Sequence, residues 1–230
     1  MTDPPAEPPA ELVLPLVVRI ERVDPPTRTD ALEAAARAVL LMLTSDEPDW
    51  RDAIRAWDGS RIRKVVRRGR GAEWRRALTL PGITVTQRSA EVRVYPPLPV
   101  DAWPPELSRL QVGGTHLDDP EPPPPPDPAL PLVLVSPHVE MSAGKATAQV
   151  GHAAQLGWRA SSPGPRERWC ELGFDTAVRT ATPRQWRDAL RKAVPVVHDA
   201  GFTELEPGSR TAAFVSGSAL RTGRTTRPCG

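Results

Sequence analysis

The chain has 230 residues, with 30 lysines and arginines against 28 aspartates and glutamates, a formal net charge of +2. This length suits one large or two small domains, and a hydrophobic content of 39% is too high for a wholly disordered chain. No apolar run reaches the roughly 18 residues that span a membrane, and the start, MTDPPAEPPAE, lacks the basic stretch of a signal peptide. We therefore expect a cytoplasmic protein without membrane contact.

Proline-rich stretches divide the chain. The segment EPPPPPDP at 121–128 forms neither a helix nor a central strand, because proline lacks the backbone N–H and favours an extended conformation. We predict a semi-rigid, acidic linker over 118–128, with a surface loop inside one domain as the alternative. The expected organisation is a disordered tail (1–10), a first domain (11–117), this linker, a second domain (129–217) and a flexible basic tail (218–230).

The first half alternates between strand and helix patterns. Its predicted elements, in chain order, are an apolar strand over 12–20, an alanine-rich helix over 30–43, a strand over 63–67, a helix from Gly71, and strands over 83–86 and 91–95. Strands that alternate with helices indicate an α/β fold. We expect a small mixed sheet of four strands flanked by helices.

The second half follows the same plan. The predictions are strands over 131–136, 176–180, 194–198 and 211–215, and helices over 145–159 and from Pro183. Thr182 is a suitable N-cap, since Pro183 then takes the first helical position. The α/β unit is thus expected twice in tandem.

Short matches between the halves support a duplication. Leu14-Pro15-Leu16-Val17-Val18 corresponds to Leu130-Pro131-Leu132-Val133-Leu134, Val65-Val66-Arg67 to Val178-Arg179, and Trp74-Arg75-Arg76-Ala77-Leu78 to Trp186-Arg187-Asp188-Ala189-Leu190. The matching positions lie about 112–116 residues apart and in the same order. A duplicated chain is the simplest explanation of three ordered matches.

The segment MSAGKATAQVGHA begins at a predicted strand-to-helix junction. Gly144 allows close approach of the backbone, and Lys145 adds a positive charge to the unpaired N–H groups of the helix start. This combination suits a phosphate or a developing oxyanion, although its spacing is not that of a P-loop. Gln149 and His152 share the helix face of Lys145. His152 has two interpretations, a base and a partly buried structural histidine.

A second polar segment, HDAGFTELEPGSRTA, follows the predicted strand 194–198. Asp199 stands at the strand end, where open sheets bind ligands, and the Thr203 hydroxyl follows four residues later. A carboxylate and a hydroxyl at this spacing can orient a water for attack on an ester. The alternative is a turn in which the aspartate only closes a loop.

These two segments, in this order, resemble the type 2 peptidyl-tRNA hydrolase family. The resemblance covers residues 129–217. It implies an enzyme with a four-stranded mixed sheet that cleaves the ester between peptide and tRNA 3′ end, needs no metal or other cofactor, and normally forms a homodimer. The catalytic residues it implies are Lys145, Asp199 and Thr203. We assign substrate binding to Ser142, Gly144, Gln149, His152, Gly201 and Arg179.

The chain departs from the family pattern at several positions. His198 and Phe202 replace basic residues of the family, and Asp175 replaces a lysine that often opens the middle strand. The first half lacks the motifs, because PPTRTDALEAAA stands where the glycine–lysine pair is expected. We therefore predict a degenerate first copy that forms an intramolecular pseudo-dimer with the intact second copy, and hence a monomer.

The first half carries a dense group of basic residues between positions 61 and 76. We predict possible RNA contacts at Arg63, Lys64, Arg67, Arg68 and Arg70. Such a group neutralises phosphates and steers RNA, whereas the alternative is an ordinary solvated face. The expected partner is tRNA. Two other functions stay open, an inactive RNA- or protein-binding module with the same fold and a hydrolase of another acyl ester.

Overall fold

The computed structural model describes residues 11–113 and 116–221. In the first half the elements are β1 (Leu12–Arg19), α1 (Arg28–Leu43), a 3-10 turn (Pro48–Trp50), α2 (Arg51–Asp58), β2 (Lys64–Gly69), α3 (Gly71–Ala77), β3 (Ile83–Gln87), β4 (Ala90–Val94), β5 (Leu98–Pro99) and α4 (Pro105–Ser108). In the second half they are β6 (Leu132–Val135), α5 (Ala143–Ala160), α6 (Pro163–Glu171), β7 (Ala177–Thr180), α7 (Pro183–Arg191), β8 (Val196–His198), β9 (Arg210–Val215) and α8 (Ser218–Arg221).

Each half contains one mixed sheet. The first is ordered β2-β1-β4-β3, with the two-residue β5 added beside β1, and the second is ordered β7-β6-β9-β8. In each sheet the first pair is parallel and the other pairs are antiparallel. The α/β class is confirmed. The expectation of four strands in each sheet is wrong for the first, because β5 pairs with the start of β1 and makes five.

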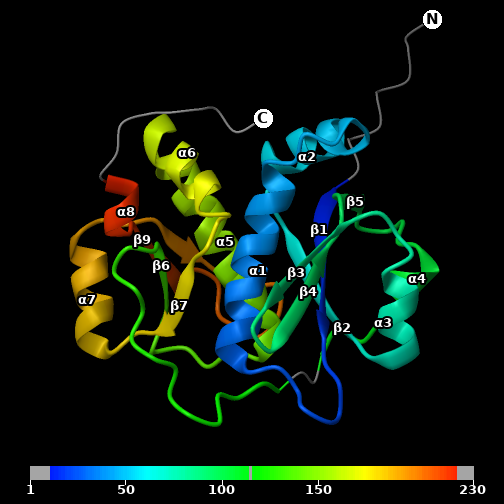
Figure 1. Ribbon diagram of the computed structural model, residues 1–230, viewed down its shortest axis with the longest axis horizontal. Helices are drawn as coiled ribbons and strands as arrows, with labels where there is room; N and C mark the ends of the chain where they lie inside the picture. The colour runs from blue at the N-terminus through cyan, green and yellow to red at the C-terminus, as the bar shows by residue number, and fades with distance from the viewer. Residues whose placement is uncertain (1–10, 114–115, 222–230) are drawn as a thin grey trace, which may run out of the picture.

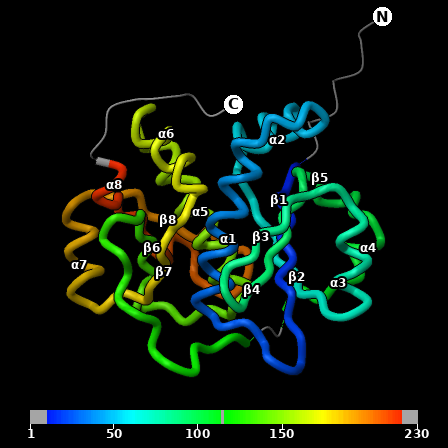
Figure 2. The backbone as a smooth tube through the Cα atoms, in the orientation of Figure 1, coloured from blue at the N-terminus to red at the C-terminus, as the bar shows by residue number. Residues whose placement is uncertain are grey.

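The helices α1 and α5 pack against each other at the centre of the molecule (Figure 1). The first sheet lies on one side of this helix pair and the second sheet on the other, and the tube view shows the two halves side by side (Figure 2). Gly151 of α5 permits the close approach, since a β-carbon there would lie 2.9 Å from Cγ2 of Val39. The helix pair therefore joins the two halves.

The composition of α1 follows from this central position. Its residues Ala31, Ala34, Ala35, Ala38, Val39 and Met42 belong to the core against the first sheet. Leu32, Ala36 and Leu40, spaced by four on another face, belong to the core of the second half. A helix buried on two faces needs apolar residues nearly all round, which explains the run of alanines and leucines.

Buried charges also connect the halves. The Glu33 side chain of α1, 5% exposed, accepts a hydrogen bond from the backbone N–H of Val178 at 3.2 Å and pairs with Arg179 at 2.7 Å. Arg179 in turn donates to the carbonyl oxygen of Pro124. At the start of α1, the Asp119 carboxylate accepts from the backbone N–H and the hydroxyl of Thr29, both at 2.8 Å. The predicted linker is thus held along both halves by specific hydrogen bonds.

The chain ends need one correction. The tail predicted for 218–230 begins with helix α8, and its Leu220 is buried in the core of the second half. Residues 222–230 and the predicted tail 1–10 lie outside the described residues. Within 11–113 and 116–221, no helix combines the length and the apolarity that crossing a membrane requires.

Candidate active site between the two halves

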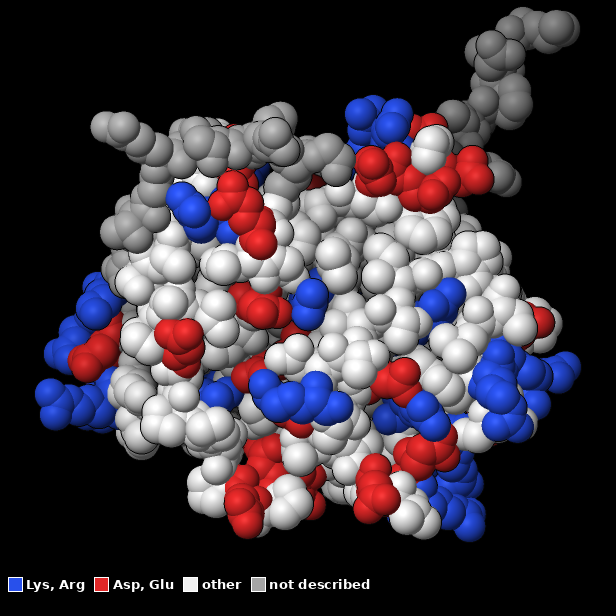
Figure 3. All heavy atoms as spheres, in the orientation of Figure 1, with Lys and Arg blue, Asp and Glu red and all other residues white. Residues whose placement is uncertain are grey.

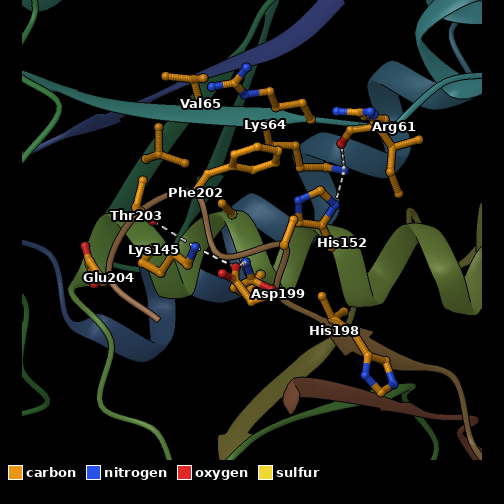
Figure 4. A pocket seen from close by; sticks show the side chains of 18 of the residues that line it. Arg61, Lys64, Val65, Lys145, His152, His198, Asp199, Phe202, Thr203 and Glu204 are labelled. Carbon is orange, nitrogen blue, oxygen red and sulfur yellow. Dashed lines mark hydrogen bonds and ion pairs between the residues drawn. The ribbon is translucent and has the colours of Figure 1, made fainter. Parts of the chain in front are cut away.

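A cavity of about 630 Å³ opens between the two halves. The second half contributes the N-terminal part of α5 and the loop after β8, while the first half contributes residues 61–66 at the start of β2 (Figure 4). Seven of the predicted catalytic and substrate-binding residues line it: Ser142, Gly144, Lys145, Gln149 and His152 at the start of α5, and Asp199 and Thr203 in the loop. Segments far apart in the sequence therefore meet at one site.

Lys145, Asp199 and Thr203 are in direct contact. The Lys145 ammonium lies 2.5 Å from Oδ2 of Asp199 and donates to the Thr203 hydroxyl at 2.9 Å (Figure 4). The side chains of Lys145 and Asp199 are only 11% and 4% exposed. An ammonium has three N–H donors, and no protein partner for the third is found among the described residues. That donor is available to a bound oxygen.

Local structure fixes both ends of this pair. The Ser142 hydroxyl caps α5 by accepting from the backbone N–H of Lys145 at 3.2 Å, and it donates to Glu204 at 2.5 Å. On the other side, the β8–β9 register shifts between Val197 and His198. A register shift of this kind changes the direction of the following side chains, and Asp199 follows it directly.

The Asp199 carboxylate is fully engaged. Its Oδ1 accepts from the backbone N–H of Gly201 at 2.9 Å, and its Oδ2 accepts from Nε2 of Gln149 at 2.8 Å in addition to Lys145. Gly201 has φ +78°, and a β-carbon there would lie 2.4 Å from Cγ of Pro207. Glycine is therefore required for the loop that holds the carboxylate.

Thr211 is a site residue that the sequence reasoning missed. This fully buried residue of β9 donates from Oγ1 to Oε1 of Gln149 at 2.6 Å. The bond leaves the amide nitrogen of Gln149 directed at Asp199. The threonine lies within the quoted HDAGFTELEPGSRTA segment, so a polar residue in an otherwise apolar strand was the available signal.

Lys64 enters the cavity from the first half. It is 7% exposed, donates to Oε1 of Gln155 at 2.6 Å, and lies 3.2 Å from Nδ1 of His152. Burial is the main cause that holds the pKa of Lys64 well below 10.5. Burial, followed by the charges of Lys64 and Lys145, lowers the pKa of His152 well below 6.5.

The other two predicted substrate-binding residues, Arg179 and Gly201, do not line the cavity. Arg179 instead pairs with Glu33 at 2.7 Å between the halves. The ring of His198 points away from Lys145 and Asp199 (Figure 4). Phe202, in contrast, stands 60% exposed at the cavity, with the Arg63 guanidinium 5.2 Å from its ring centre.

The structure does not bring the predicted basic group together on one face. Lys64 is buried, and Arg67 donates to the carbonyl oxygens of Ser108 and Leu110 and stacks on Trp103 at 4.6 Å. Arg68 bonds to Gln111. Successive side chains of β2 point to opposite faces of the sheet, so these basic residues do not share one face. The exposed arginines of this segment include Arg70, Arg75 and Arg76, around α3, where Figure 3 shows a cluster of positive charge.

No protein-family model matches the chain in a search against such models. Among the described residues, no group of three or more histidine, cysteine, aspartate or glutamate side chains is arranged to hold a metal ion. The side chains that line the cavity determine the chemistry that it can support. They are a buried ammonium with a free donor, a carboxylate that holds it, a hydroxyl, and an imidazole. Such groups can stabilise a developing oxyanion and move a proton.

Proposed function

We propose that this protein is a peptidyl-tRNA hydrolase of type 2 design, acting on the ester between peptide and tRNA 3′ end in the cytoplasm. The observation that carries the proposal is the contact of Lys145 with both Asp199 and Thr203 in a cavity. These are the three residues that the resemblance implies as catalytic. Their separation in sequence, with Lys145 on α5 and the other two after β8, makes a chance meeting a poor explanation.

The contacts suggest a role for each group. The free N–H of Lys145 donates to the ester carbonyl oxygen, where negative charge develops as water attacks the carbonyl carbon. Asp199 orients the Lys145 ammonium through Oδ2, and the hydrogen bonds from Gln149 and Gly201 hold the carboxylate in place. Thr203 accepts from Lys145, so its own hydroxyl proton is left for the substrate or the attacking water.

We propose further that the two halves form an intramolecular pseudo-dimer, active as a monomer. The identical strand order of the two sheets supports this, as does the packing of α1 against the equivalent helix α5. In this arrangement tRNA contacts the exposed arginines around α3 while its 3′ end enters the cavity between the halves. Gel filtration with light scattering should give a mass near the 25.0 kDa of one chain.

The decisive experiment measures release of tRNA from a peptidyl-tRNA in the presence of EDTA. Wild type should cleave, Lys145→Ala should lose the activity while keeping the fold, and the exposed lysine variant Lys192→Ala should match wild type. Full turnover by Lys145→Ala would refute the assignment. If wild type binds tRNA and cleaves nothing, the chain is instead a binding module. If it neither binds nor cleaves, its substrate is another acyl ester or lies outside this chemistry.

A further inference from the structure

The Lys64–His152 pair has no assigned role in this mechanism, although it lies in the same cavity. Both residues line the cavity, and Gln149, which bonds to Asp199, precedes His152 by three residues on α5. Side chains at this spacing are neighbours, with β-carbons about 5–6 Å apart. The pair is thus next to the proposed catalytic residues and is supplied by both halves of the chain.

The hydrogen bonds around Lys64 suit an uncharged amine. Such an amine has two N–H donors and one lone pair. Two oxygens receive the donors, Oε1 of Gln155 at 2.6 Å and the carbonyl oxygen of Ile62 at 3.4 Å. The lone pair then accepts from Nδ1–H of His152 at 3.2 Å. This leaves Nε2 of His152 unprotonated, and no partner for it occurs in the part of the chain that the structure describes.

The same surroundings also accommodate the charged form. As an ammonium, Lys64 donates to the two oxygens and to the Nδ1 lone pair, and its charge lies 4.7 Å from the centre of the Trp57 ring. No carboxylate lies within 4.0 Å of this nitrogen among the described residues. Asp58, whose charge acts on Lys64, accepts from Gln155 and Arg159 instead. Both protonation states are therefore satisfied, and a proton can move between them.

Lysine usage supports a special role for this amine. Only three of the 30 basic residues are lysines, and two of these, Lys64 and Lys145, line one cavity. Arginine cannot release its proton in a protein, whereas a buried lysine can. Burial is the main cause that lowers the pKa of both Lys64 and His152, so it favours the uncharged pair that the hydrogen bonds indicate. The other charged or titratable groups facing the pair and its cavity are Asp58, Arg159, Lys145, Asp199, Glu11, Arg61, Arg63, His198 and Glu204.

We propose that Lys64 and His152 form a proton relay shared between the two halves, with His152 as the base and Lys64 as the final proton acceptor. The role rests on the proposed function. Water gives one proton to Nε2 of His152 while its oxygen bonds to the ester carbonyl carbon. The Nδ1 proton passes to Lys64, which becomes an ammonium. When the bond from carbonyl carbon to ribose oxygen breaks, a proton returns along the same path to that oxygen.

Asp199 is poorly placed for this task, because its oxygens already accept from Lys145, Gln149 and Gly201. The relay also gives the first half a chemical purpose. That half lacks the glycine–lysine and Asp-Ala-Gly motifs, yet it contributes the amine that completes the site. The second half alone would hold His152 without its proton acceptor.

The test begins with the tautomer of His152, read by ¹⁵N NMR of histidine-labelled protein at pH 7, with His152→Gln used for assignment. The proton should reside on Nδ1 in wild type and move to Nε2 in Lys64→Met, since the partner of one nitrogen decides which carries the proton. A wild-type His152 protonated on Nε2 would overturn the relay. The wild-type tautomer is read without any turnover, so it decides the pair independently of the proposed function.

Kinetics on peptidyl-tRNA then test whether the relay is used. Lys64→Met and His152→Gln should each lower kcat by about 10²- to 10⁴-fold, the usual contribution of a general base. The kcat of the double variant should fall no further than that of the less active single variant, because the two residues act as a unit. Lys192→Met is the matched control and should retain wild-type kinetics. Full turnover by Lys64→Met overturns the relay, whereas the expected tautomer in a wild type that cleaves nothing supports the pair and refutes the hydrolase.

Discussion

Replacing Lys145 by methionine should destabilise the protein as well as inactivate it. The substitution keeps the length of the side chain but leaves the Asp199 carboxylate, 4% exposed, without its cation. Removing one partner of a buried ion pair costs about 3–5 kcal/mol. Gln149 and Gly201 still donate to the carboxylate, and the cavity admits water. We therefore expect the lower end, about 3 kcal/mol.

For a chain of this size, each 1 kcal/mol lowers the melting temperature by about 2–4 °C, so Lys145→Met should melt about 6–12 °C below wild type. The assay is thermal and urea unfolding followed by circular dichroism. In the double variant Lys145→Met/Asp199→Asn no buried charge is left unpaired, and the two changes should couple by about 1–3 kcal/mol. The double variant should therefore be more stable than the sum of the single changes predicts.

The control for this prediction is Arg191→Met, which removes an exposed ion pair with Asp188. The Arg191 side chain is 75% exposed and the Asp188 side chain 40% exposed. Water and salt screen such a pair, so its melting temperature should stay near that of wild type. The reasoning would be refuted by a Lys145→Met protein that melts with wild type, or by strict additivity in the double variant. Either result would mean that the lysine does not stabilise the buried Asp199 carboxylate.

Two further predictions concern packing and pH. Gly157→Ala should cost about 1–3 kcal/mol in urea unfolding, because its β-carbon would lie 2.4 Å from the buried Phe214 ring, whereas Gly164→Ala meets nothing within 4 Å and should not destabilise. The lowered pKa of His152 means that the unfolded chain binds the extra proton below pH 6.5. Stability should therefore fall as the pH drops below 6.5, by up to about 1.4 kcal/mol per unit until the folded-state pKa is reached. Unfolding curves of His152→Gln should lack this contribution; an identical pH dependence would contradict it.

Local patterns were enough to predict most of the elements. The predicted strand over 12–20 became β1, and the helix predicted over 145–159 extends over Ala143–Ala160 as α5. The capping box of α7, formed by Thr182 and Gln185, confirms the predicted N-cap. These features depend on hydrophobic periodicity and on capping residues. Both signals lie within a few residues of one another and can be read from one segment alone. Helices α2 and α6 were missed. Helix α2 follows a 3-10 turn that begins at Pro48, α6 itself begins at Pro163, and each holds few buried side chains.

The sequence by itself determined which segments are strands and helices and which residues near Lys145 and Asp199 deserve attention, because such signals are local. Only the tertiary structure decided what the rest of the chain does for the site. The packing of α5 against β2 places Lys64 beside His152, so this lysine of an arginine-rich segment is buried and is not an exposed RNA contact. The packing of α1 against β7 likewise pairs Arg179 with Glu33. These pairings join residues 88 and 146 positions apart, and no local pattern specifies a partner at that distance.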